Sequence, residues 1–99
     1  MRQHIKGIDH VVVVVRDLDA ARDTFRRMGF TVTPRGYHSL GSQNHCVMFG
    51  DDYIELLWSP EGAPHPSRQY YTDFARAGEG LAAIALKTTN AKGAYTEML

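Results

Sequence analysis

Five consecutive valines at positions 11–15 constrain the fold more than any other feature of this chain. Valine favours β-strands because its branched side chain packs well on a pleated surface. Neighbouring residues of a strand point to opposite faces of the sheet. The unbroken apolar run therefore predicts a strand over residues 8–15 that is covered, at least in part, on both faces.

An amphipathic helix is predicted directly after this strand. Asp17 or Asp19 is expected to cap its N-terminus, because a carboxylate accepts hydrogen bonds from the free amides of the first turn. Gly29 is expected to end it, since glycine readily adopts the left-handed conformation that follows many helices. The apolar residues between them recur at helical spacing on one face: Leu18, Ala21, Phe25 and Met28.

The remaining elements follow from shorter patterns. A β-rich run covers residues 30–33, and two strands are predicted over 45–49 and 53–58, joined by a tight turn at 50–52. Residues 37–43 are rich in Ser and Gly and predict a loop. Three prolines and one glycine between 59 and 67 predict an irregular connection, which leads to a short helix over 68–77. A strand over 81–88 and a helix capped by Asn90 complete the chain.

A weak internal repeat organises these elements. Residues 7–11 overlay residues 80–84 without a gap, and the overlay matches Asp17 with Asn90 at two helix starts. We therefore expect one α+β domain with three parts. Residues 1–58 form a complete βαβββ module on a curved mixed or antiparallel sheet, with helices on its convex face. Residues 59–79 connect this module to residues 80–99, the first strand and partial helix of a second one.

Composition excludes several classes of protein. The chain has 99 residues, 43% of them hydrophobic, and its eleven basic residues balance eleven acidic ones. A neutral chain without a long apolar run is not expected to bind nucleic acid or a membrane. The lone cysteine, Cys46, excludes an internal disulfide framework and a CxxC zinc site, and we expect it to be a small buried hydrophobic residue. These features predict a soluble cytoplasmic domain.

Four segments of the chain resemble the vicinal oxygen chelate superfamily. They are residues 7–10 (GIDH, followed by valines), 17–21 (DLDAA), 29–32 (GFTV) and 52–57 (DYIELL). The glyoxalase-like branch is most similar, because its loop-and-hairpin pattern resembles His38, Gly41, Asn44 and the turn at 50–53. The resemblance implies paired βαβββ modules that form a cupped sheet around a small-molecule site. Many members of the superfamily hold a divalent metal in that cup, and others have lost it.

His10 and Glu55 are the principal site candidates. His10 lies in a strand of valines, and Glu55 is a carboxylate within an apolar run. From the residues alone, they could be a core histidine and a solvent-facing glutamate without any role in a site. The resemblance implies that both are metal ligands, with Glu55 also catalytic. Imidazole nitrogen and carboxylate oxygen suit Zn, Ni, Fe or Mn equally. The family takes further ligands from the second module, where the counterpart of His10 is Ala83, which cannot coordinate.

Strand parity separates two neighbouring candidates. A two-residue turn at Asp51-Asp52 pairs Met48 with Glu55 and places Asn44 on the face of Glu55, with His45 turned away into a structural position. A three-residue turn would instead bring His45 inward. We favour the two-residue turn.

The resemblance also implies roles for residues outside the metal pair. Asn44, His38 and Tyr53 are expected to contact substrate. His38, in a glycine-flanked loop, is also expected to act as a catalytic acid–base group, although an exposed loop histidine is the alternative.

The sequence leaves three hypotheses about function open. The first is a metal-dependent lyase, isomerase or dioxygenase-type enzyme acting on a small molecule with vicinal oxygens. The second is a metal-free binding module, of the bleomycin-resistance type, that sequesters a ligand in the same cup. Ala83 favours this hypothesis because it cannot coordinate a metal. The third is an inactive truncated fragment. We also expect a homodimer, because a single module leaves sheet edges open.

Overall fold

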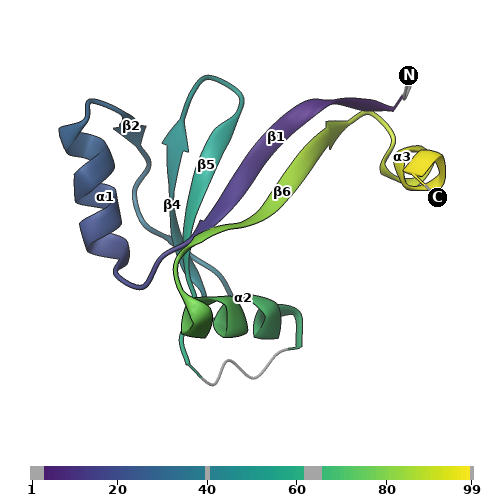
Figure 1. The fold of residues 1–99 in the computed structure, drawn as a ribbon. Coiled ribbons are helices and arrows are strands. Elements are labelled where there is room, and N and C mark those ends of the chain that lie inside the picture. The colour runs from purple at the N-terminus through teal and green to yellow at the C-terminus, as the bar shows by residue number, and fades with distance from the viewer. Residues whose placement is uncertain (1–3, 40, 62–65, 99) are drawn as a thin grey trace.

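A computed structural model describes residues 4–39, 41–61 and 66–98 of the chain. The elements follow in the order β1 (Ile5–Val14), α1 (Leu18–Arg27), β2 (Thr31–Val32), β3 (Gly36–Tyr37), β4 (Gln43–Met48), β5 (Tyr53–Trp58), α2 (Pro66–Ala77), β6 (Gly80–Thr88) and α3 (Ala91–Met98) (Figure 1). Among the described residues, no helix is long and apolar enough to cross a lipid bilayer.

The strands form one twisted, mixed sheet. Its order is β2-β4-β5-β1-β6, and β3 pairs with β4 beside β2. Strand β1 runs parallel to β5 and antiparallel to β6, and the other pairs are antiparallel. The βαβββ fold of the predicted first module is therefore confirmed, with the strand of the following unit added beside β1.

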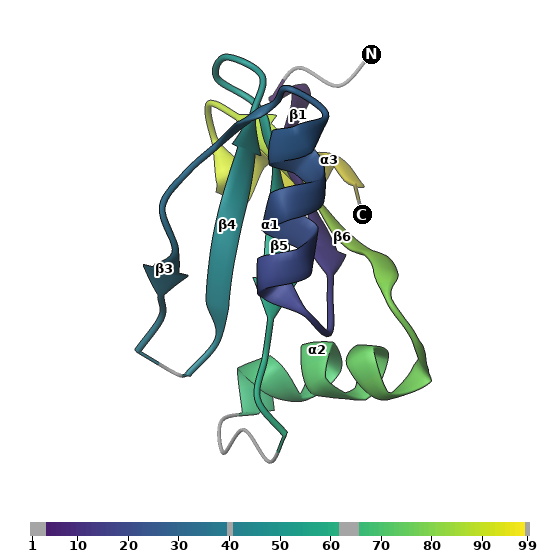
Figure 2. The same cartoon turned by 90° about the vertical axis from the view of Figure 1, so that its left-hand side faces the viewer.

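Helix α1 covers one face of the sheet, as Figure 2 shows. Asp17 caps it by accepting a hydrogen bond from the Ala20 amide at 3.0 Å. Gly29 follows the helix with a φ of +93°, the left-handed conformation predicted from the sequence. The core under α1 consists of the buried Val15, Leu18, Val47 and Leu56, with Val13, Ile54 and Phe25 packed around them. We call the opposite face of the sheet the open face.

Strand β1 is covered on both faces only near its C-terminal end. Val12 and Val14 are buried on the open face, and Val15 is buried under α1. Helix α2 contacts β1 and lies across this end of the sheet (Figures 1 and 2). The prediction from the valine run is thus confirmed where α1 and α2 both lie close to the strand.

The β4–β5 hairpin has a longer turn than predicted. Tyr53 pairs with Met48, whereas the prediction paired Glu55 with Met48, and the observed partner of Glu55 is Cys46. Because the difference is two residues, every side chain keeps its predicted face. Asn44 therefore shares the face of Glu55, as expected from the sequence.

A hydrogen bond within the turn explains this register. The Phe49 amide donates to the Asp52 carbonyl at 3.0 Å, so the turn takes in residues 49–52. Gly50 has a φ of +107°, which residues with a side chain rarely adopt. The predicted turn at residues 51 and 52 was wrong because it placed Gly50 in the strand.

Residues 37–43 are not entirely a loop. Gly36 pairs with Asn44 and Tyr37 with Gln43, so β4 begins two residues earlier than predicted. The Ser and Gly content of this stretch predicted a loop correctly only for its centre, because pairing with β4 gives the flanking residues strand geometry.

The β1–β6 pairing agrees with the weak repeat. Val11 pairs with Ile84, its counterpart in the gapless overlay. Leu81, Ile84 and Leu86 of β6 are each more than two-fifths exposed. In the described part of the chain, β6 pairs only with β1 and is an edge strand with an apolar surface.

Candidate functional site

Three neighbouring strands bring four of the predicted site residues to the open face. The β1–β5 register pairs His10 with Tyr53 and Val12 with Glu55. Since directly paired residues share a face, His10, Tyr53 and Glu55 lie together. Asn44 of β4 joins them through the β4–β5 register.

His10 and Glu55 face each other across the β1–β5 pair. His10 Nε2 lies 3.8 Å from Glu55 Oε1, and both side chains are mostly buried, at 21% and 15% exposed. This separation is too long for a hydrogen bond. A ring nitrogen and a carboxylate oxygen thus stand close together without a direct bond.

Asn44 holds the other oxygen of the glutamate. Its Nδ2 donates to Glu55 Oε2 at 2.8 Å. Gly36 of β3 makes room for this contact, since a Cβ there would lie 2.3 Å from Asn44 Oδ1. The hydrogen bond leaves Glu55 Oε1 directed toward His10.

Tyr53 stacks on the imidazole of His10. The two ring centroids are 4.6 Å apart and the ring planes differ by 4°. Burial raises the pKa of the Tyr53 phenol, and Cys46, Asp9 and Glu55 raise it further. Tyr53 is therefore a neutral hydrogen-bond donor at neutral pH.

Cys46 lies beside Glu55 on the open face and is half-buried rather than buried. Burial raises the pKa of its thiol, and the charge of Glu55 raises it further, against an opposing hydrogen bond with Thr33. The thiol thus stays protonated at neutral pH, in keeping with the predicted role as a small apolar residue.

Asp9 is the site residue that sequence reasoning missed. Its Oδ2 lies 2.8 Å from His10 Nδ1. In a regular strand Asp9 and His10 would point to opposite faces. The register of β1 against β6 shifts between Ile8 and His10, so Asp9 lies in an irregularity of the strand. Sequence alone gave no signal for this shift, because it depends on the distant partner strand.

His38 is not joined to the other four residues. Its Nδ1 lies 2.6 Å from Ser42 Oγ, and its amide donates to the Ser42 carbonyl. Across residues 4–39, 41–61 and 66–98, no hydrogen bond or ion pair connects His38 to His10, Glu55 or Asn44.

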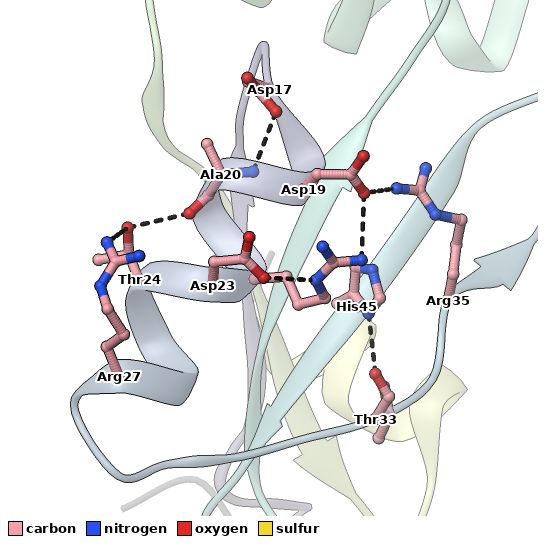
Figure 3. Close-up of polar contacts among 10 residues, drawn as sticks. Asp17, Asp19, Ala20, Asp23, Thr24, Arg27, Thr33, Arg35 and His45 are labelled. Carbon is pink, nitrogen blue, oxygen red and sulfur yellow. Dashed lines mark hydrogen bonds and ion pairs between the residues drawn. The ribbon is translucent and has the colours of Figure 1, made fainter.

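His45 points toward α1, as the favoured parity predicts. Figure 3 shows it beneath the helix, where its Nδ1 donates to the Thr33 carbonyl at 2.8 Å. The side chain is only 2% exposed, and its Nε2 has no hydrogen-bond partner in the described structure. His45 is therefore a core residue on the face opposite to His10.

A cavity of about 320 Å³ lies at the N-terminus of α1, away from these residues. It is lined by Arg16, Asp17, Leu18, Asp19, Arg35, Gln43 and Trp58. Arg35 pairs with Asp19 of α1, as Figure 3 shows, and it also donates to Gln43 of β4. These contacts join α1 to the sheet. The cavity contains none of the predicted site residues.

The donor set on the open face fits two ligands of a divalent metal. Ligands that each lie about 2.1 Å from one ion are roughly 3.0–3.4 Å from each other. The 3.8 Å between His10 Nε2 and Glu55 Oε1 is slightly larger, so a small side-chain movement would bring both to one ion. Among the described residues, no group of three or more His, Cys, Asp or Glu side chains is arranged to hold a metal.

Ala83 occupies the position that the repeat matches with His10. It pairs with Val12, whose other neighbour is Glu55, and it therefore lies on the open face. A methyl group at this position adds no ligand, as the sequence predicted.

A family model for the glyoxalase-like domain matches residues 8–98. The chain belongs to the glyoxalase-like domain family. This confirms the resemblance to the vicinal oxygen chelate superfamily. Comparison with curated protein sequences finds no match.

Solved structures support the same fold. Methylmalonyl-CoA epimerase of Streptomyces coelicolor, in complex with 2-nitronate-propionyl-CoA, is similar at 23% identity and a TM-score of 0.76, covering 95% of this chain and 68% of that protein. The Mycobacterium tuberculosis methylmalonyl-CoA epimerase is 18% identical with a TM-score of 0.74, covering 95% and 63%. A hypothetical protein of Bacillus halodurans is 21% identical with a TM-score of 0.71, covering 92% and 64%. The chain thus spans about two thirds of the length of these proteins.

Proposed function

We propose that this glyoxalase-like protein binds a divalent metal, of the Zn, Ni, Fe or Mn class, through His10 and Glu55. We further propose that it catalyses an isomerase or lyase reaction on a small molecule with two neighbouring oxygens. The observation that carries the proposal is the pair itself: His10 Nε2 and Glu55 Oε1 face each other at 3.8 Å without a hydrogen bond. Two facing acceptors are unfavourable unless a cation or a proton lies between them.

The other residues of the open face have supporting roles in this proposal. When bound, the metal would stabilise negative charge that develops on the substrate oxygens. Asn44 fixes the glutamate so that one oxygen stays toward His10. The neutral Tyr53 phenol offers a hydrogen bond to substrate. His38, held by Ser42 at Nδ1, is proposed as an acid–base group that approaches over the site.

The solved structures favour an isomerase over a lyase within this proposal. Several of them are named methylmalonyl-CoA epimerase, and one of these is in complex with methylmalonyl-CoA and NH4+. Epimerisation moves a proton at one carbon, which suits a carboxylate beside a charge-stabilising group. An acyl-CoA ester is therefore the first substrate class to test.

A metal-free binding module is the second candidate, and Ala83 favours it. The pair of ligands on β1 and β5 has no counterpart at Ala83 on β6, and few metal sites hold an ion with two protein ligands. In this alternative, His10, Glu55, Asn44 and His38 line a pocket for a polar ligand.

Metal analysis of the purified chain separates the two candidates. We expect Mn²⁺, Ni²⁺ or Zn²⁺ to bind in calorimetric titration, and His10→Ala and Glu55→Gln to weaken binding sharply while the protein stays folded. His4→Ala and Glu61→Gln are matched controls, since Glu61 pairs with Arg76 on the surface and His4 pairs with Glu97. If His10 were only a packed residue, His10→Ala would instead lower the free energy of unfolding by about 1–3 kcal/mol. Absence of metal binding by the parent chain would favour the metal-free module.

We also propose that the protein works as a cytoplasmic homodimer. The exposed Leu81, Ile84 and Leu86 of β6 support this proposal, because an edge strand with apolar side chains is a surface for pairing with another chain. A second copy of the chain is the partner we expect at this edge.

A further inference from the structure

Asp9 touches a predicted metal ligand although it precedes that ligand directly in the chain. Strand β1 pairs Ile8 with Leu86 and then His10 with Ala85, so Asp9 has no partner in β6. An extra residue of this kind bends a strand and redirects its side chains. The Asp9 carboxylate thereby reaches the His10 ring, with Oδ2 2.8 Å from Nδ1.

This contact determines which ring nitrogen carries the proton. A carboxylate only accepts hydrogen bonds, so a neutral His10 ring places its proton on Nδ1 and donates it to Asp9. The lone pair is then on Nε2, the nitrogen that faces Glu55. The opposite tautomer would direct a lone pair at Asp9 and would lose the 2.8 Å hydrogen bond.

Stacking orients the ring, and two carboxylates lie beside it. Tyr53 lies parallel to the His10 ring, which restricts rotation of the imidazole. Asp9 and Glu55 place one carboxylate at each nitrogen, and no Lys or Arg forms an ion pair with either of them in the described residues. The site therefore presents an oriented Nε2 in a negatively charged setting, which suits a cation.

We propose that Asp9 is a positioning residue that sets the tautomer and orientation of His10, so that Nε2 is the nitrogen available to a divalent cation. The proposal rests on the proposed metal-binding function for its purpose. The tautomer of His10 can be measured on the protein without metal. The role of Asp9 and the metal-binding function can therefore be tested independently of each other.

Nitrogen-15 NMR of the full chain tests the tautomer directly. The spectra are recorded above the pH at which the ring signals stop changing, and His10→Ala identifies the His10 signals by their loss. In the parent we expect a protonated Nδ1 and an unprotonated Nε2. Asp9→Ala should shift His10 toward the Nε2-protonated form. Asp9→Asn should keep much of the parental tautomer, because the amide oxygen still accepts from Nδ1.

Titration with Zn²⁺ or Ni²⁺ gives the second readout. Loss of such a supporting hydrogen bond typically weakens metal binding by about 10–100-fold, and we expect Asp9→Ala to fall in this range. Asp51→Ala, which removes an exposed carboxylate from the β4–β5 turn, should change neither the tautomer nor the affinity.

Two results would overturn the proposal. One is an unchanged His10 tautomer in a folded Asp9→Ala protein, or in Asp9→Leu should the alanine variant not fold. The other is a shifted tautomer without weaker binding in a chain whose metal binding depends on His10. A parent chain that binds no metal, but whose tautomer responds to Asp9→Ala, would overturn the proposed function while supporting the role of Asp9 in positioning.

Discussion

Two histidines of the same sheet, one in β1 and one in β4, differ in role because they lie on opposite faces of the sheet. His10 lies on the open face, where Asp9, Tyr53 and Glu55 contact its ring. His45 is buried beneath α1, and only its Nδ1 finds a partner. A buried nitrogen without a hydrogen bond costs stability, which the packing of the ring and its bond to Thr33 have to offset. At the scale of single residues, the face of the sheet separates a candidate ligand from a core residue.

The pKa of the Cys46 thiol is raised by burial and, next, by the charge of Glu55. The raised pKa of the thiol means that the folded protein disfavours the thiolate. Its contribution to stability is therefore present at neutral pH and is lost as the pH rises from the pKa of the unfolded thiol through the higher pKa of the folded one. We expect Cys46 to react with a thiol reagent more slowly in the folded chain than in urea at about pH 8, where free thiols are partly ionised.

Glu55→Gln should speed this reaction in the folded protein, because it removes the second cause of the raised pKa. Glu61→Gln, on the surface, should leave the rate unchanged. Equal rates in the parent and in Glu55→Gln, measured by reagent absorbance, would show that the glutamate charge does not act on the thiol.

At the scale of elements, α1 depends on its cap. Asp17 accepts from the Ala20 amide and so satisfies one of the free donors of the first turn. Asp17→Ala should lower the free energy of unfolding by about 1 kcal/mol, while Asp17→Asn should restore most of it. Urea titration monitored by circular dichroism measures both. An Asp17→Ala midpoint equal to that of the parent would contradict the role of the cap.

At the scale of the whole molecule, we expect β6 to determine the state of association. An edge strand with Leu81, Ile84 and Leu86 exposed is unfavourable in water unless it is covered. We expect light scattering to give the mass of a dimer at tens of micromolar protein, and Ile84→Lys to give a monomer. Met28→Lys, at an exposed residue beyond the C-terminal end of α1, should leave the dimer intact. A monomeric parent would exclude pairing through β6.

The three-part division of the chain into 1–58, 59–79 and 80–99 stays a prediction at this scale. The pairing of Val11 with Ile84 agrees with two related units, because the overlay and the strand register select the same pair. The sheet itself is continuous across them in the described residues.

Sequence by itself determined the order of the elements apart from the short β3, an aspartate cap for α1 at Asp17 or Asp19, the limits of β5 and the sides taken by Asn44, His45 and Glu55. These are local properties. A cap depends on a few neighbouring residues, and the face of a strand residue depends only on odd or even position, which a register error of two leaves intact.

Tertiary structure alone decided the rest. The hairpin register was set by how the turn closes between Phe49 and Asp52. The contact between Asp9 and His10 arose because the pairing of β1 with β6, more than seventy residues away in the chain, has a register shift at Asp9. Such features depend on hydrogen bonds between distant strands, whose alignment is fixed only when the whole sheet forms, so no local pattern in the sequence encodes them.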